Sequence, residues 1–273
     1  MLATCSVSPA TDSQRDTDTM EKHIIGRGLL AGALAGVLAF VWSKLFIEPV
    51  IGRAIDFENG VGAAHEAAGH SHGGHSHGGE ESAELFSRGV QSNIGMGLGV
   101  LIFSVAMGAL LAVVFCVVYG RINLSARALA ALTAGGMLVS LWIVPALKYP
   151  PNPPAVSLDE TIKQRTLLYV LLVVLSAALF VGSILLVRRL IPKFGVWNSA
   201  LIGVADYVVS MAVVFLILPT IDETPSTFPA DDLYEFRLYS LGTQIVIWTT
   251  IGLAFGALVS KLLDGKRQEQ LTA

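Results

Sequence analysis

The chain carries little charge for its length. Of its 273 residues only 14% are Asp, Glu, Lys or Arg, whereas 53% are hydrophobic. Soluble globular domains carry about 25% charged residues, so this composition excludes an ordinary water-soluble domain. Cysteine is almost absent as well. Cys5 lies in a polar stretch and Cys116 in an apolar one, which argues against a disulfide framework.

Several motifs of enzymes and nucleic-acid-binding proteins are also missing. The sequence contains no GxxxxGK[ST] loop for ATP, no HExxH zinc-protease motif and no GxSxG hydrolase motif. No basic, aromatic-rich patch for nucleic acid is found either. We therefore expect no enzyme, no nucleic-acid partner and no ATP hydrolysis by this chain.

Long apolar runs dominate what is present. A helix rises 1.5 Å per residue, so about 20 residues cross a hydrocarbon core of roughly 30 Å. The alternating pattern of a β-barrel is absent, and helices satisfy their backbone groups internally in lipid. We predict an all-α, polytopic transmembrane helical bundle. Its six predicted spans cover residues 28–47, 89–120, 128–147, 166–187, 194–221 and 238–260.

The segments outside the spans are polar. Residues 1–19 lack the apolar core of a secretory signal peptide. We expect them to be disordered, or the true start to be Met20. The transmembrane domain then covers 20–265, with an outer loop at 48–88 and a cytoplasmic tail at 266–273.

The Lys and Arg residues are unevenly divided between the two sides of the predicted bundle. One side holds both termini and, before Arg15 is counted, ten basic residues: Lys22, Arg27, Arg121, Arg127, Arg188, Arg189, Lys193, Lys261, Lys266 and Arg267. The other side holds six over longer loops: Arg53, Arg88, Lys148, Lys163, Arg165 and Arg237. Because Lys and Arg accumulate in cytoplasmic loops, we predict that both termini are cytoplasmic.

Five of the six histidines fall within 13 residues of the outer loop. They are His65, His70, His72, His75 and His77. Neutral imidazole binds Co²⁺, Ni²⁺, Zn²⁺ and Cu²⁺, and the Gly- and Ser-rich backbone allows several rings to converge on one ion. The alternative is a solvated linker that binds metal only incidentally.

Asp206 is the one acidic residue deep inside a predicted span. An ionised side chain near a helix centre costs about 2.5–3.5 kcal/mol on insertion scales, so we expect it to face the bundle interior, a polar partner or water. It is either a cation or proton site, or a structural hydrogen-bonding group that reaches a Tyr or Ser. Tyr207, Asn93 and Gln244 are candidate partners.

Glycine spacing predicts close helix contacts. Gly28, Gly32 and Gly36 form two overlapping GxxxG steps in the first span, and Gly252 and Gly256 repeat the spacing in the last. Small residues let helix backbones approach one another in lipid.

Two short runs resemble a known family. They are Phe86-Ser-Arg88-Gly-Val-Gln91 and Leu147-Lys148-Tyr-Pro-Pro-Asn152-Pro-Pro-Ala155. Together with the His-rich loop they resemble the CbtA family, predicted cobalt transporter subunits of bacteria. The resemblance implies Co²⁺ uptake across the inner membrane, a link to cobalamin biosynthesis, and a small single-span partner, CbtB, with histidines of its own. The proline run itself predicts either a stiff cap for a partner or a rigid turn.

Two hypotheses follow. In the first, a transporter subunit captures a divalent metal on the His-rich loop, and interior polar groups, Asp206 foremost, pass it inward. The metal is Co²⁺, or alternatively Ni²⁺ or Zn²⁺. In the second, the chain is a metal-binding sensor or accessory subunit that does not itself transport. The sequence leaves open whether the chain forms a homo-oligomer in the lipid membrane.

The predicted topology can be tested by labelling. A cysteine introduced at His72 should react with a membrane-impermeant maleimide in intact cells. A cysteine at Arg188 should react only after the membrane is permeabilised. The opposite pattern would reverse the predicted direction of metal entry.

Overall fold

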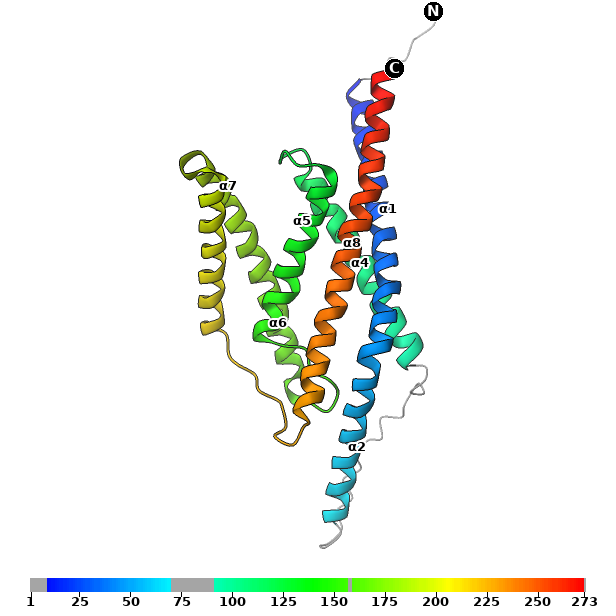
Figure 1. Cartoon of the computed structure of the whole chain (residues 1–273), viewed down its shortest axis with the longest axis vertical. Helices are drawn as coiled ribbons and strands as arrows, with labels where there is room; N and C mark the ends of the chain where they lie inside the picture. The colour runs from blue at the N-terminus through cyan, green and yellow to red at the C-terminus, as the bar shows by residue number, and fades with distance from the viewer. Residues whose placement is uncertain (1–8, 70–90, 157–158, 273) are drawn as a thin grey trace, which may run out of the picture. The chain divides into compact units, whose positions relative to one another are not determined.

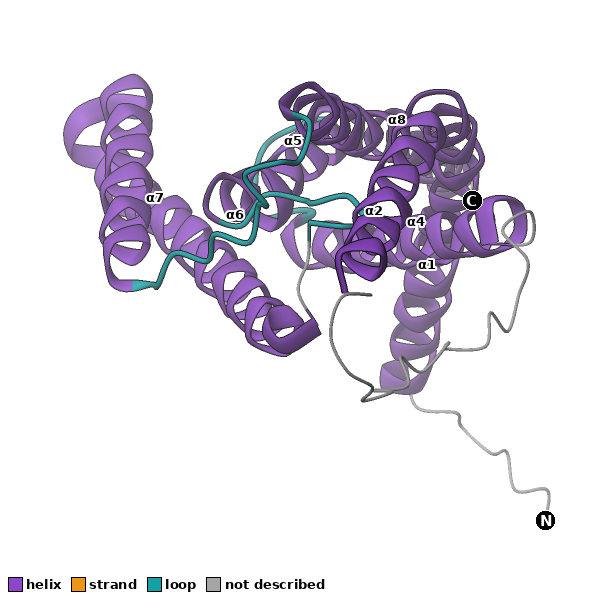
Figure 2. Cartoon of the chain, turned by 90° about the horizontal axis from the view of Figure 1, so that it is seen from below, coloured by secondary structure: helices purple, strands orange, loops and turns teal. Residues whose placement is uncertain are grey.

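The predicted all-α class is confirmed. The computed structural model describes residues 9–69, 91–156 and 159–272, and within these ranges it contains helices and connecting loops but no strand (Figure 2). The helical elements are α1 (Pro9–Trp42), η1 (Ser43–Ile47), α2 (Glu48–Gly69), η2 (Gln91–Gly95), α4 (Met96–Val118), α5 (Ala126–Leu138), η3 (Val139–Ile143), α6 (Val144–Lys148), α7 (Asp159–Ile217) and α8 (Ala230–Thr272). The three η elements are short π-helical turns.

Five helical stretches of the described chain are long and apolar enough to cross a membrane. They are Met20–Gly60, Asn93–Val118, Ala126–Lys148, Thr161–Ile217 and Ala230–Asp264. The six predicted spans differ from this count at one place, because the fourth and fifth both fall within α7. The chain is therefore multi-pass, and the number of crossings depends on how α7 is built.

α7 consists of two helical legs joined at Gly195. That residue has φ 74° and ψ 172°, far from helical values, and glycine adopts a positive φ without a Cβ penalty. Figure 1 shows the two legs of α7 meeting at a turn. The sequence analysis expected a loop there. Instead, the chain reverses at one glycine, so helical hydrogen bonding continues almost to the turn on both sides.

Contacts between the two legs follow an antiparallel register. Near the turn, Gly203 lies against Val187. Farther from it, the Ser176 and Tyr207 hydroxyls are 2.7 Å apart. Leu172, Tyr207 and Met211 then form a buried cluster with Tyr149. The legs thus pack along much of their length, as expected for an αα-hairpin.

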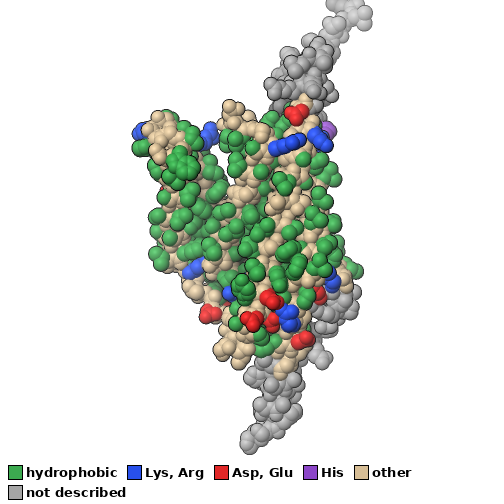
Figure 3. Space-filling model, viewed as in Figure 1, with side chains coloured by type: hydrophobic (Ala, Val, Ile, Leu, Met, Phe, Trp, Pro, Cys, Tyr) green, Lys and Arg blue, Asp and Glu red, His purple; other side chains and the backbone are tan. Residues whose placement is uncertain are grey.

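The described chain separates into two compact units. The first comprises Met1–Phe40, Asn93–Gly135 and Val246–Ala273, and the second comprises Val41–Ser92 and Gly136–Ile245. Figure 3 shows hydrophobic side chains over the visible surface of the helices, with charged side chains near helix ends. This distribution suits helices whose surroundings are apolar.

Small residues form the contact between α1 and α4 in the first unit. A Cβ on Gly28 would lie 2.5 Å from the carbonyl oxygen of Gly108, and one on Gly32 would overlap the carbonyl oxygen of Ser104. Ala31, Ala35 and Ala39 on α1 are almost completely buried. The backbones therefore approach closely without large side chains between them, which confirms the GxxxG prediction for the first span.

The last span makes a similar but looser contact. A Cβ on Gly252 would lie 2.8 Å from Cβ of Ala134, and one on Gly256 would lie 3.3 Å from Cβ of Ala130. α8 thus packs on the small-residue face of α5. Phe255 of α8 also meets Phe115 of α4 edge-to-face at 5.2 Å.

The first outer loop is shorter than predicted. α2 continues the helix through Glu48 and on to Gly69, whereas the sequence analysis placed a loop from residue 48. The sequence analysis ended the helix before residue 48 because the apolar run ends at a charged residue there. The residues that follow still favour a helix, so the helix continues. In the same way, α1 begins at Pro9 and includes residues 9–19, which were expected to be disordered. Proline is well suited to a first helical position, and residues 10–22 contain no further glycine or proline.

Two prolines follow π-helical turns at matching distances. η1 precedes Pro49 and η3 precedes Pro145, in each case with one residue between turn and proline. A proline in a helix removes one N–H and crowds the carbonyl of the residue four positions earlier. That residue is Leu45 for Pro49 and Leu141 for Pro145. Both carbonyls lie in the π turns, where the backbone is locally wider.

The α1–α4 contact gives a stability prediction. Gly108→Ala places a methyl group against the backbone of Gly28 and Gly32, and should lower the free energy of unfolding by about 1–3 kcal/mol. Gly99→Ala on the same helix meets nothing within 4 Å, and should be neutral or stabilising by up to about 1 kcal/mol. Thermal unfolding in detergent compares them, and equal stabilities would contradict the close packing.

Candidate functional site

The predicted histidine ligands fall largely outside the described residues. His70, His72, His75 and His77 lie in the range 70–90. His65 lies in α2, in a part whose side chains are not described. The metal-binding role of this segment stays a prediction. Among the described residues, no group of three or more His, Cys, Asp or Glu side chains could hold a metal ion.

Asp206 lies on the second leg of α7 and accepts a hydrogen bond from Ser183 of the first leg. The Ser183 Oγ to Asp206 Oδ2 distance is 2.7 Å. The sequence analysis allowed a serine in this role but put forward Tyr207, Asn93 and Gln244. Tyr207 is instead paired with Ser176. Ser183 is nearly buried, so the hydroxyl that holds Asp206 is itself fixed within the hairpin.

The Asp206 side chain is exposed on the surface of the hairpin in the single chain. Of the three expected surroundings, the structure supplies a polar partner, Ser183. The neighbours of Asp206, namely Val204, Val208 and Val209, are 58–63% exposed. One hydroxyl partner satisfies only part of a carboxylate, which has about four lone-pair sites. A carboxylate on an apolar helix surface is costly in lipid, so this surface requires further polar partners or water when the chain is in a membrane.

The proline run forms a second cluster of polar contacts, in the second unit. We call this cluster the strap network: the segment Lys148–Asn152 and the residues that bond to it. The Tyr149 hydroxyl donates to the carbonyl of Pro219 at 2.7 Å. Lys148 Nζ lies 3.1 Å from Thr220 Oγ1. The strap is thereby tied to the segment that follows α7.

Two arginines hold the strap from other helices. Arg165 of α7 donates through Nη2 to the carbonyl of Pro150 at 2.5 Å. Arg237 of α8 donates through Nη2 to Asn152 Oδ1 at 3.1 Å. Prolines supply carbonyl acceptors but no N–H donors, which explains why donor-rich arginines surround them. These bonds tie the strap to both helices, which is compatible with either the stiff cap or the rigid turn that the proline run predicts.

A buried carboxylate completes the strap network. The Glu223 side chain is only 3% exposed and lies 3.3 Å from Arg165 Nη1, and it also accepts a hydrogen bond from Thr161. Burial raises the pKa of the neighbouring Tyr149 phenol, so the hydroxyl stays protonated and can donate to Pro219. The sequence identifies Glu223 and Arg165 as loop charges, but nothing in their local sequence indicates which of several loop charges are buried and paired.

The comparisons with known proteins now bear on this geometry. A family model described as CbtA, probable cobalt transporter subunit, matches residues 21–260. The chain belongs to the CbtA family. No curated protein and no solved structure matches it. The match covers nearly the whole chain, including the strap network and Asp206, so this CbtA chain is a multi-pass membrane protein of a transporter-subunit family.

The strap network gives a second stability prediction. Arg165→Gln leaves the buried Glu223 without its ion-pair partner and should cost about 3 kcal/mol of unfolding free energy. The control is Arg53→Gln. Arg53 pairs with Asp232 and Glu235, but its side chain is 46% exposed, so its loss should cost at most about 1 kcal/mol. Thermal unfolding in detergent measures both. A larger loss for Arg53→Gln would refute the structural role of the buried pair.

Proposed function

We propose that this CbtA chain imports a divalent transition metal, with Co²⁺ as the foremost cargo. The observation that carries the proposal is the family match over residues 21–260, in a chain with a His-rich segment between its first two spans. Imidazoles at the outer face would concentrate the ion. Ni²⁺ and Zn²⁺ bind the same ligand type and are the cargo alternatives.

The topology we propose has six spans and cytoplasmic termini, in the inner membrane of a bacterium. The two legs of α7 support six crossings, because the leg after Gly195 extends for about 33 Å at 1.5 Å per residue. The excess of Lys and Arg on the side of the termini supports the orientation. In this topology the histidines face outward and the turn at Gly195 faces the cytoplasm.

Transport in this scheme needs no ATP. A negative-inside membrane potential favours cation entry by about 2.3 kcal/mol per charge per 100 mV, and by twice as much for a divalent ion. The Asp206 carboxylate supplies a negative charge within the membrane region, and Ser183 orients it. Because Asp206 is exposed in the single chain, we place its role at a contact with a partner. The single-span CbtB-like subunit implied by the family resemblance is the partner we propose there.

A second candidate function is an accessory subunit that binds metal without transporting it. It is favoured by one observation, that the described helices hold no cluster of three metal-ligating side chains. Purified protein in sealed vesicles with an enclosed Co²⁺-sensitive dye separates the two functions. Influx without a partner supports the importer, influx only with a partner supports a shared pathway, and binding without influx in either case supports the accessory role.

Two variants test the assigned residues by uptake in a transport-deficient host. Deletion of residues 65–77 should reduce Co²⁺ uptake at low metal concentration and leave the maximal rate nearly unchanged, because it removes capture and not passage. Asp206→Asn should lower the maximal rate even at high metal concentration. Val208→Asn, which adds a polar group to an exposed position of the same helix on a different face from Asp206, is the control. Unchanged uptake in both test variants would refute the roles given to these residues.

A further inference from the structure

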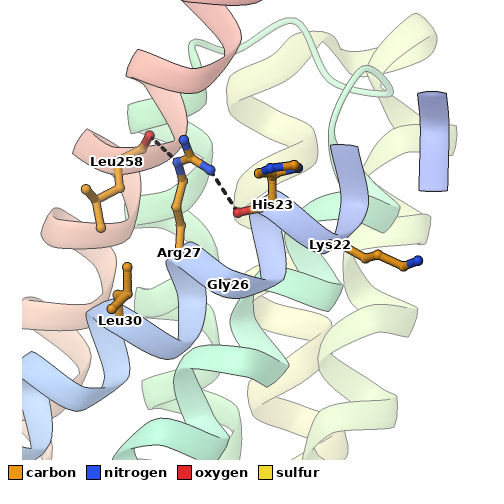
Figure 4. A pocket seen from close by; sticks show the side chains of 6 residues that line it. All are labelled: Lys22, His23, Gly26, Arg27, Leu30 and Leu258. Carbon is orange, nitrogen blue, oxygen red and sulfur yellow. Dashed lines mark hydrogen bonds between the residues drawn. The ribbon is translucent and has the colours of Figure 1, made fainter. Parts of the chain in front are cut away.

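A recess lies in the first unit, between the N-terminal half of α1 and the C-terminal half of α8. Its volume is about 480 Å³, and it is lined by Lys22, His23, Gly26, Arg27, Leu30 and Leu258. Figure 4 shows these side chains around the recess. Neither the metal pathway nor the strap network uses any of them.

One basic side chain at this recess, Arg27, is held in place by hydrogen bonds. Arg27 donates through Nε to the carbonyl of Leu258 at 3.1 Å and through Nη1 to the carbonyl of His23 at 3.0 Å (Figure 4). A guanidinium has five N–H donors in a fixed plane, so these two bonds orient the group and leave donors for a ligand. Lys22 and His23 lie just over one helical turn before Arg27.

Among the residues whose side chains the structure describes, no acidic one lines the recess. The recess therefore offers a surplus of positive charge to a ligand. This repels a divalent cation and favours an anion.

The other end of the recess is apolar. Leu30 is 65% exposed, and with Leu258 it continues the surface past the basic groups. Lys22 and Leu30 are about 12 Å apart along the helix axis, and the charge-free run of α1 begins at Gly28. The change from basic to apolar thus falls where the helix enters the hydrocarbon core, which is where a phospholipid changes from phosphate to acyl chain.

We propose that this recess is a binding site for one anionic phospholipid. Lys22 and Arg27 contact the phosphate, and an acyl chain lies along Leu30 and Leu258. Basic pockets between transmembrane helices suit anionic head groups on the cytoplasmic side. Gly26 makes room for the head group, because it has no side chain and nothing lies within 4 Å of its Cβ position.

This open position allows a test that changes no charge. Gly26→Leu adds a side chain at the recess, at a position where a Cβ meets nothing within 4 Å. Lys22→Ala removes one exposed charge and leaves both Arg27 hydrogen bonds in place. The control is Arg188→Ala combined with Arg189→Ala, which removes two exposed basic side chains from the turn region of α7, outside the recess.

The experiment is lipid retention by the full-length protein, measured by native mass spectrometry from a neutral detergent. The probes are dioleoylphosphatidylglycerol, dioleoylphosphatidylcholine and glycerol phosphate. Wild type should retain one phosphatidylglycerol in clear preference to phosphatidylcholine. Lys22→Ala should weaken retention about fivefold, Gly26→Leu should abolish it, and the α7 control should retain the lipid as wild type does.

Three outcomes would overturn the proposal. Equal retention of the two lipids would show that the head-group charge is not recognised. A loss in the α7 control as large as in Lys22→Ala would show a general surface-charge effect. Displacement of the lipid by millimolar glycerol phosphate would show a site for a free anion instead. None of these outcomes depends on metal transport, so the test of lipid binding is independent of the test of the proposed function.

Discussion

The lack of water around the helices is the constraint on which this fold depends. In lipid, apolar side chains gain nothing by leaving their surroundings, so helices associate through close packing and polar contacts. The first unit shows the packing solution. Gly28 and Gly32 meet the backbone of α4 directly, and large side chains such as Leu30 and Leu34 lie on the outside. In this contact small residues are buried and large apolar side chains are exposed, which is partly the reverse of the arrangement in a soluble protein core.

The second unit shows the polar solution. Its strap offers carbonyl and side-chain oxygens to arginines from two helices, and Glu223 is neutralised by Arg165. Proline carbonyls suit this arrangement because no N–H on the same residue needs a partner. Asp206 differs from these groups, since Ser183 is its one hydrogen-bond partner in the described chain and its surface is open. This contrast is why Asp206, and not the better-buried Glu223, is the residue we assign to transport.

Much of the fold could be predicted from the sequence. The length of the apolar runs and the GxxxG spacing identify the helices and their closest contact, because both depend on local features. Helix ends were less predictable. Charge at Glu48 and Arg53 marked the end of the apolar run but not the end of the helix. The charged residues at 188–193 predicted a loop of several residues, whereas the chain reverses at Gly195 alone. The surroundings of Asp206 could not be predicted either, because which helix face meets a neighbour is decided by tertiary packing.

The reversal at Gly195 also fixes a distance. Because the turn consists of a single residue, the position of each residue of the second leg along the helix axis follows from its distance in sequence from Gly195. Asp206 comes eleven residues later, about 16 Å along the axis. If the turn lies at the membrane surface, this carboxylate is close to the midplane of a core about 30 Å thick. Inserting one residue after Gly195 would shift the charge by about 1.5 Å and turn it about 100° around the helix, away from Ser183. The position of Gly195 in the sequence thereby determines how far along the helix axis Asp206 lies from the turn.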